Sequence, residues 1–495
     1  MSTSFYDVLI AGTDLSGLLL GAMAAKKGYR VLVAGQGAQP NQYPHGQHIF
    51  HREADFFTGL DSSPAVKRVL TDLGVGQEVR SRPQPLDPWL QVILPTGRVG
   101  MSSRERVAQA ELEREFPGDA APIQQFLRAV RSEHQAFNAF LEENPPLPPE
   151  GWTEKREFSR IAAAHPAVSE SDLLRDPFAV FPADHPFRAF AMAPAIFTAR
   201  HDLANAGLRA RMRVLGHLAG GVFEMPGGID GLKQFFIDRI QQHASDVRTD
   251  ISLDGLLVKR GKVLEAQVRD RRESIGCHLI VCASDAKRFF RMVPPEHQKE
   301  RFHHRLHTLQ PTHHVFTVNV AMAGRGVPVG MGRHVIVVGD LKAPLEDENA
   351  LLVTRQPESA DGSVVLTVSC RLRTRRFNPS VSFVGEMTHE ILGRLRGSVF
   401  PFLDEHLLAV HSPWLSMDPS TGEQTFEPEE MRPIFGGDAE GTLGCSSMGV
   451  HTEYRNVVVC NDGVFGALGC EGPWVAALNA MRQLETKVVL KSVLS

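Results

Sequence analysis

The fold of this chain is decided near its N-terminus, by the run Tyr6-Asp7-Val8-Leu9-Ile10-Ala11-Gly12-Thr13-Asp14-Leu15-Ser16-Gly17. The four residues after Asp7, Val8 to Ala11, are all apolar, which predicts a short buried strand over residues 6–11. Residues 18–27 are rich in Leu, Ala and Met and predict a helix, and residues 30–34 predict a second strand. A strand, a glycine-bounded turn, a helix and another strand within about 30 residues are typical of a dinucleotide-binding βαβ unit.

The glycine loop departs from a working dinucleotide fingerprint at its second position. The first glycine of such a loop makes the tight turn, the second lets the diphosphate approach, and the third lets helix and strand pack closely. Gly12 and Gly17 fill the first and third places, but Asp14 fills the second. A bound dinucleotide would bring its negative phosphates close to the Asp14 carboxylate. Two unit charges about 4 Å apart repel by about 4 kcal/mol at a protein-like dielectric. The glycine loop therefore predicts a βαβ fold and argues against the binding of a dinucleotide.

Length, charge and cysteine usage narrow the class of protein. The chain has 495 residues, 42% of them hydrophobic, with 53 Lys and Arg against 57 Asp and Glu, so no basic excess points to nucleic acid. The six cysteines form no C-x-x-C pair, so we expect small core residues and no metal site. No leader pattern and no apolar run of membrane-spanning length occurs, so we expect a cytoplasmic protein.

The pattern along the chain predicts an α/β protein with an inserted domain. We expect the Rossmann-like dinucleotide-binding domain to be assembled from residues 1–51, 221–312 and 450–495. We expect an α+β substrate or cap domain from residues 52–220, which are mostly helical in pattern, and 313–449, which begin with strands that alternate polar and apolar residues. Residues 396–450 are rich in Pro, Gly and Asp and predict irregular chain.

Two groups of histidines invite a metal-site hypothesis. His45, His48 and His51 are spaced by three, but Pro44 and Gly46 argue against a regular helix, so a solvated loop is the better prediction. A second group lies within residues 297–314, and without a carboxylate pattern we expect a surface cluster that is sensitive to pH.

Three segments, in this order, resemble the phytoene desaturase and amine oxidase group of FAD-dependent oxidoreductases, to which Rab GDP-dissociation inhibitors are structurally related. The first is the βαβ unit. The second begins at Pro226-Gly227-Gly228 and ends at Val281-Cys282-Ala283-Ser284-Asp285-Ala286-Lys287. The third is Asn456-Val457-Val458-Val459-Cys460-Asn461-Asp462 with the following Gly469-Cys470-Glu471-Gly472-Pro473. The resemblance implies FAD as the cofactor but identifies no catalytic residue. The implied cofactor contacts are Gly12, Thr13, Asp14, Leu15, Ser16, Gly17, Leu253 at the adenine, Asp462, Glu471 and Gly472.

The sequence also lacks parts of the family pattern. Gly35 stands where an acidic residue would bind the ribose hydroxyls, and residues 36–40 contain no Gly-Gly pair. Asn461-Asp462 replaces a Gly-Asp. These departures leave two main hypotheses: an FAD-dependent oxidoreductase with a weakened FAD site and a hydrophobic substrate, or a non-catalytic, flavin-free relative. The relative would bind a lipid, a prenyl group or a protein partner, and a peripheral membrane contact is compatible with either hypothesis. A third reading is another nucleotide held through a metal ion at Asp14.

Overall fold

The computed structural model describes residues 2–166, 176–203, 206–308, 310–378, 380–418, 421–427, 432–436, 444 and 449–489. Within these residues the main sheet contains seven strands, which come from three distant parts of the chain. They are β1 (Ser2–Ala11), β2 (Val31–Ala34), β11 (Asp246–Arg248), β12 (Leu253–Lys259), β13 (Lys262–Val268), β14 (Glu273–Cys282) and β23 (Val457–Val459). Their order is β11-β2-β1-β14-β13-β12, and β23 pairs with the free part of β14.

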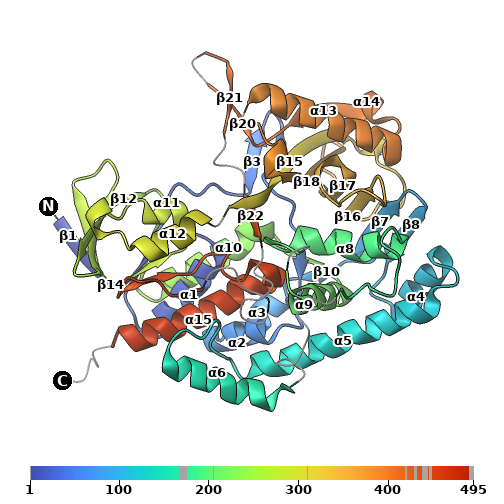
Figure 1. Cartoon of the computed structure of the whole chain (residues 1–495). Coiled ribbons are helices and arrows are strands. Elements are labelled where there is room, and N and C mark those ends of the chain that lie inside the picture. The colour runs from blue at the N-terminus through green and yellow to red at the C-terminus, as the bar shows by residue number, and fades with distance from the viewer. Residues whose placement is uncertain are drawn as a thin grey trace.

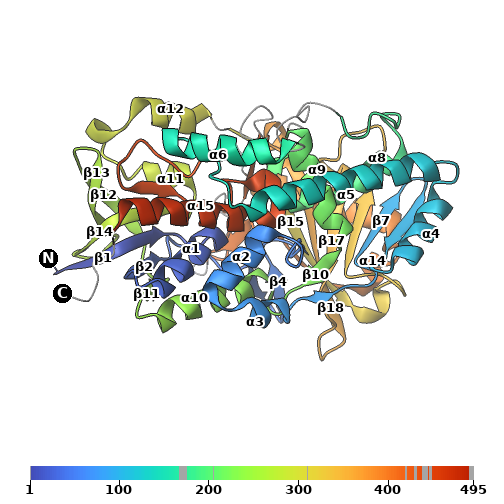
Figure 2. The same cartoon turned by 90° about the horizontal axis from the view of Figure 1, so that it is seen from below.

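The centre of this sheet is parallel and buried. β1 runs parallel to β14 from Ser2↔Glu273 to Ala11↔Cys282, and parallel to β2 on its other side. Helices α1 (Leu15–Lys26), α10 (Gly228–Gln242) and α15 (Gly472–Lys487) pack along it, and α1 contacts both of the others (Figures 1 and 2). Apolar strands covered by helices are what a βαβ unit requires. The predicted α/β class with a Rossmann-like domain is confirmed.

A second, mostly antiparallel sheet contains nine strands among the described residues. They are β7 (Leu90–Leu94), β8 (Gly97–Met101), β9 (His201–Asp202), β15 (Pro311–Ala323), β16 (His334–Val338), β17 (Ala350–Arg355), β18 (Ser363–Arg373), β19 (Leu407–His411) and β22 (Pro433–Gly436). The strands predicted between residues 313 and 371 are present. The irregular chain predicted for residues 396–450 is wrong in part, because β19 and β22 lie there; short, half-exposed strands leave no clear alternation in the sequence.

The remaining helices surround the two sheets (Figure 1). They are α2 (Pro64–Leu73), α3 (Gly76–Arg80), α4 (Glu105–Glu115), α5 (Ala120–Glu142), α6 (Trp152–Ala164), α8 (Pro186–Thr198), α9 (Leu208–Ala219), α11 (Ala286–Phe290), α12 (Glu300–Thr308), α13 (Val381–Ser398) and α14 (Leu403–His406). Shorter strands are β5 (Phe57–Thr58), β6 (Gln84–Pro85) and β10 (Val222–Glu224), with the hairpins β3 (Gln42–His45) with β4 (His48–His51) and β20 (Leu415–Met417) with β21 (Gln424–Phe426).

Two further sequence expectations concern the core and the membrane. Cys277, Cys282, Cys370 and Cys460 are buried free thiols, as expected for small core residues. None of the described helices combines the length and the apolar character needed to cross a bilayer.

Candidate nucleotide site at the carboxyl edge of the main sheet

The loops after β1, β14 and β23 meet at the edge of the main sheet where open α/β folds bind their ligands. Gly12 has a φ of +118°, and a Cβ atom there would lie 2.1 Å from the carbonyl oxygen of Ala283. A Cβ atom at Gly17 would lie 2.3 Å from that of Ala283. Both glycines are therefore required by the close approach of the first loop to the end of β14, whether or not a ligand binds.

Asp14 and Asp462 join the loop after β1 to the loop after β23. The Asp462 carboxylate accepts a hydrogen bond from the Ser16 backbone N–H at 3.1 Å, and the Asp462 N–H donates to Asp14 Oδ2 at 3.3 Å. Ser16 Oγ lies 2.9 Å from the Cys460 carbonyl oxygen and 3.1 Å from Asp462 Oδ1. The N-terminal amides of a helix attract phosphate oxygens. In this structure one of those amides, the Ser16 N–H in the first turn of α1, already donates to the carboxylate of Asp462.

Two arginines contact Glu53, and one of them, Arg432, also lies beside Asp462. Arg432 Nη2 is 3.9 Å from Asp462 Oδ2, while its Nη1 is 3.3 Å from Glu53 Oε2. Arg200 Nη1 lies 2.8 Å from the same oxygen of Glu53. Burial would raise the pKa of Glu53, but the two arginines outweigh it and lower this pKa to about 2. The positive charge of Arg432 beside Asp462 is therefore shared with the Glu53 carboxylate, which is ionised at neutral pH.

The carboxyl group of Asp14 is the titratable group most affected by this arrangement. Burial first, and then the negative charge of Asp462, raise its pKa from 3.8 to about 6, although Arg432 and Lys233 act in the opposite direction. Thr13 and Leu15 flank it; Leu15 is buried in the core and Thr13 is half-buried. The site already carries one carboxylate and a second that ionises near neutral pH.

The end of the site nearest β2 is also filled by the chain. A Cβ atom at Gly35 would lie 2.1 Å from the Thr249 carbonyl oxygen, so no acidic side chain fits there unless the backbone moves. The Leu253 N–H, at the start of β12, donates to the Gln36 side-chain carbonyl. Gln36 itself has a left-handed φ of +55°. The Leu253 N–H, which the resemblance places at the adenine, is thus already hydrogen-bonded to Gln36 of the same chain.

The carboxylate of Glu471, just before α15, is directed at α9. Arg213 donates to its two oxygens at 2.7 and 2.8 Å, His217 lies 3.2 Å away, and Ser63 Oγ donates at 2.5 Å. The side chains of Glu471 and Arg213 are fully buried. Burial opposes ionisation, but Arg213 and His217 hold the pKa of Glu471 well below its usual range. Gly472 follows, where a Cβ atom would lie 2.4 Å from the Phe465 carbonyl oxygen.

Sequence reasoning did not find Arg213 and His217. The signal was present, because the two bases are four residues apart and lie on one face of α9. An arginine and a histidine on a helix are, however, far more often solvated than buried, so this spacing alone does not identify a partner.

Together these contacts test whether the described residues fit FAD. A diphosphate needs free amides at the start of α1, but the Ser16 amide already donates to Asp462. The diphosphate would also lie beside the carboxylates of Asp14 and Asp462. The ribose needs an acidic acceptor, which the Thr249 backbone excludes from position 35. The adenine needs the Leu253 amide, which Gln36 occupies. The residues at this edge do not fit FAD.

The first histidine group differs from its predicted solvated loop. Residues 42–51 form the β3–β4 hairpin, and His51 is buried, with its N–H donating to Asn319. His45 stacks on His411 at a centroid distance of 3.9 Å. Pro44 and Gly46 excluded a helix, but this did not exclude a hairpin. No group of three or more potential metal ligands lies together among the described residues.

The second histidine group is only partly a surface cluster. His304 and His307 are exposed, as expected, but His313 is buried, with Nε2 3.0 Å from Glu346. The reason is that His313 belongs to the long central strand β15, which the pattern of histidines alone did not indicate.

Comparison with known proteins identifies the fold. No protein-family model matches the sequence, and no curated protein sequence matches it either. Among solved structures, an oxidoreductase from Methanosarcina mazei superposes with a TM-score of 0.63 at 14% identity, over 96% of this chain and 100% of that one. Putrescine oxidase bound to putrescine gives 0.55 at 12% identity, over 98% and 100%. Cyclohexylamine oxidase from Brevibacterium oxydans gives 0.54 at 13%, over 97% and 99%.

The chain therefore has the fold of the amine oxidase-like FAD oxidoreductases along almost its whole length. At this level of identity the likeness concerns the fold, and function has to be argued from the site.

Proposed function

We propose that this protein uses the amine oxidase-type fold without flavin, and acts by binding a ligand or a partner. The observation that carries the proposal is the hydrogen bond from the Ser16 N–H to the Asp462 carboxylate. It is supported by the filled positions at Gly35 and Leu253. All three contacts are made by the chain at points where the resemblance implies contacts to FAD.

Charge supports the same proposal. A diphosphate bound at the start of α1 would approach Asp14 and Asp462. Each pair of unit charges about 4 Å apart costs about 4 kcal/mol at a protein-like dielectric, or about a thousandfold in affinity. Arg432 offsets part of this cost, but it already contacts Glu53.

We propose that the ligand is apolar, namely a lipid or a prenyl group. A protein partner and a peripheral membrane contact are the alternatives. Nucleic acid is not among them, because the charge of the chain is balanced. The buried free thiols Cys277, Cys282 and Cys370 fit a reducing compartment such as the cytoplasm, which we retain as the proposed location.

A second candidate is an FAD-dependent oxidoreductase that acts on a hydrophobic substrate, in which flavin would supply the redox chemistry. It is favoured by the amine oxidase-type fold. It requires Asp14 to be neutral and Asp462 to leave the Ser16 amide.

One experiment separates the two candidates. The protein is purified after expression with excess riboflavin, its visible spectrum is recorded, and the supernatant is assayed for flavin after denaturation. FAD is then titrated into the colourless fraction, and its binding is measured by calorimetry. The flavin-free proposal expects no flavin absorbance and no binding at micromolar FAD. Stoichiometric flavin, or micromolar affinity, would establish the second candidate instead. Solvent extraction and mass spectrometry of the same sample test for a co-purified lipid.

A further inference from the structure

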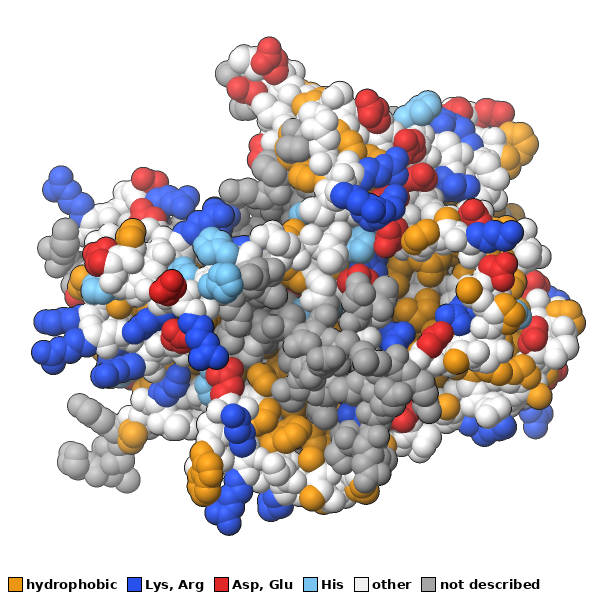
Figure 3. All heavy atoms as spheres, viewed as in Figure 1, with side chains coloured by type: hydrophobic (Ala, Val, Ile, Leu, Met, Phe, Trp, Pro, Cys, Tyr) orange, Lys and Arg blue, Asp and Glu red, His pale blue; other side chains and the backbone are white. Residues whose placement is uncertain are grey.

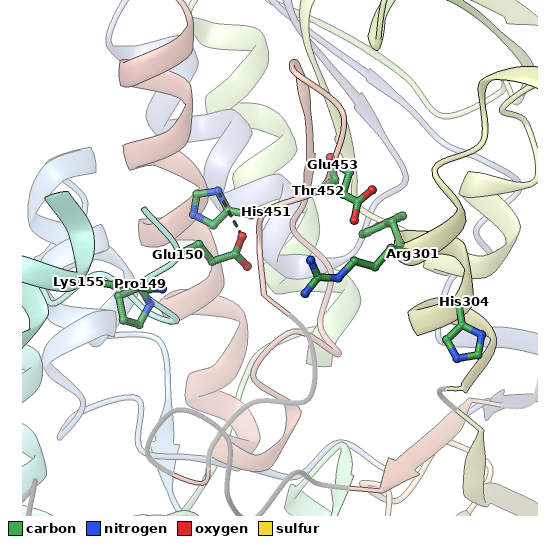
Figure 4. A pocket seen from close by; sticks show the side chains of 9 residues that line it. Pro149, Glu150, Lys155, Arg301, His304, His451, Thr452 and Glu453 are labelled. Atoms are coloured by element: carbon green, nitrogen blue, oxygen red, sulfur yellow. Dashed lines mark ion pairs between the residues drawn. The ribbon is translucent and has the colours of Figure 1, made fainter. Parts of the chain in front are cut away.

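A cavity of about 820 Å³ opens between α6, α12 and the segment 451–453 before β23 (Figure 4). Its volume lies in the range of small-molecule sites. Its lining includes none of the residues that close the nucleotide site, so it can be occupied whether or not FAD binds. On the face shown in Figure 3, histidine side chains gather over the region where Figure 1 labels α12.

Charges of both signs line this cavity. Lys155 of α6 and Arg301 of α12 are positive, while Glu150 and Glu453 are negative. Figure 4 shows the Arg301 guanidinium extending into the cavity between the sides that carry the two carboxylates. Within the described part of the chain, Arg301, Lys155 and Glu453 form no ion pair and no side-chain hydrogen bond. The cavity thus presents opposite charges that the protein does not neutralise itself.

On the α6 side of the cavity, His451 holds Glu154 and Glu150 in place. Its Nε2 lies 3.3 Å from Glu154, and its Nδ1 lies 3.9 Å from Glu150. The Glu150 N–H donates to the Glu154 carboxylate at 3.0 Å. Burial would raise the pKa of Glu154, but these bonds lower it to about 2, so the carboxylate remains ionised and keeps its partners. Glu150 is therefore positioned by both α6 and the segment that leads into β23.

The α12 side of the cavity, which carries Arg301, is attached to the same segment through Tyr454. Its hydroxyl accepts from the Lys299 N–H at 3.3 Å and lies 3.2 Å from His303 Nε2 on α12. Phe302, which also lines the cavity, is buried beside the Tyr454 ring. Because both sides are attached to residues 451–454, the fold places the segments that carry the opposite charges next to one another.

We propose that this cavity binds a zwitterionic small molecule, of the size of a short peptide, with its carboxylate on Arg301 and its ammonium group on Glu453 and Glu150. A planar guanidinium matches a carboxylate with two parallel hydrogen bonds. The formal charges of Lys155, Arg301, Glu150 and Glu453 sum to zero, so a simple anion leaves the two carboxylates unmatched and a simple cation leaves Arg301 and Lys155 unmatched. A zwitterion matches charges of both signs. This site goes beyond the proposed function and does not depend on the state of the nucleotide site.

The test uses the full chain and three matched probes: the dipeptide Ala-Ala, its N-acetylated form without the ammonium group, and its C-terminal amide without the carboxylate. Binding is measured by calorimetry and by ligand-observed NMR. The dipeptide should bind, and each blocked form should bind about tenfold more weakly, as expected for losing a hydrogen-bonded charge. Failure of the dipeptide to bind, or equal binding of all three probes, would overturn the proposal.

Two variants assign the charges to their partners. Arg301→Gln should weaken the dipeptide about tenfold but leave the amide unchanged, and Glu453→Gln should weaken the dipeptide but leave the N-acetylated form unchanged. Arg128→Gln and Glu386→Gln, at exposed positions outside the cavity lining, are the matched controls and should retain wild-type affinity. Thermal melting checks that all four variants fold. If the cavity variants behave like the controls, the zwitterion is not bound here, and the flavin experiment above is unaffected.

Discussion

Asp462 and Ser16 are 446 residues apart in the sequence, yet the carboxylate of one accepts a hydrogen bond from the backbone amide of the other at 3.1 Å. This bond joins the last loop of the main sheet to the first turn of its first helix. It places a negative side chain at the helix end that a dinucleotide would use for its phosphates. The chain satisfies this helix terminus internally.

Opening this terminus should require more than one substitution. Asp14→Gly alone leaves Asp462 on the Ser16 amide, so we expect little gain in FAD affinity. Asp14→Gly with Asp462→Ala removes both carboxylates, and we expect an affinity at least tenfold above that of Asp14→Gly, measured by quenching of flavin fluorescence. Asp254→Ala, an exposed carboxylate of β12, is the control and should change nothing. If Asp14→Gly alone equals the double variant, the Asp462 contact is not an obstacle.

The raised pKa of Asp14 predicts how stability depends on pH. Its pKa in the folded protein is about 6, above the ordinary value of 3.8, so the folded state binds the proton more tightly. This contribution to stability is present in full below about pH 4 and is lost as the pH rises through about 6. A difference of about two pKa units corresponds to about 3 kcal/mol at most.

Asp14→Asn removes this titration while retaining an acceptor for the Asp462 N–H. Urea unfolding across the pH range should show equal stability of the two proteins near pH 4 and a more stable variant above pH 6. Because the comparison is a difference, other groups such as Asp55, whose burial raises its pKa to about 7, contribute equally to both proteins. A pH-independent difference would contradict the assignment to Asp14.

The buried ion pair of Glu471 and Arg213 should be essential for stability. Glu471→Gln leaves the Arg213 guanidinium buried without a counter-charge, and breaking such a pair costs about 3–5 kcal/mol. Glu485→Gln, on the helix α15 that follows Glu471, breaks the exposed pair with Lys27 and should cost less than about 1 kcal/mol. Chemical denaturation at neutral pH compares them, and equal losses would mean that Glu471 does not carry the α9–α15 contact.

The acidic residue missing after β2 should not be restorable by substitution. Gly35→Ala and Gly35→Glu both place a Cβ atom against the Thr249 carbonyl oxygen, 2.1 Å away, so each should lower stability by roughly 1–3 kcal/mol. Gly393→Ala, inside α13 with nothing near its Cβ position, should instead gain about 1 kcal/mol. Thermal unfolding measures all three. Wild-type stability in Gly35→Glu would show that the two loops separate freely.

Several features were accessible to sequence reasoning because they depend on neighbouring residues. The βαβ unit follows from an apolar run, a glycine turn and a helix within about 30 residues. The antiparallel strands after residue 313 follow from alternation. The β3–β4 hairpin was missed because Pro44 and Gly46 favoured a loop, and the strands β19 and β22 were missed because they are short and their pairing partners are remote. The burial of His51 and His313 depends on those same pairings.

The sequence by itself determined that Gly12 and Gly17 would form the turn of a Rossmann-like sheet, because steric demands at a tight turn are local. It also indicated that Asp14 and Gly35 depart from a nucleotide-binding pattern. Only the tertiary structure decided what takes the place of the nucleotide contacts: Asp462 on Ser16, Gln36 on Leu253 and Arg213 on Glu471. Hydrogen bonds and ion pairs depend on distances of about 3 Å between groups that are hundreds of residues apart in the sequence, and those distances exist only once the chain has folded.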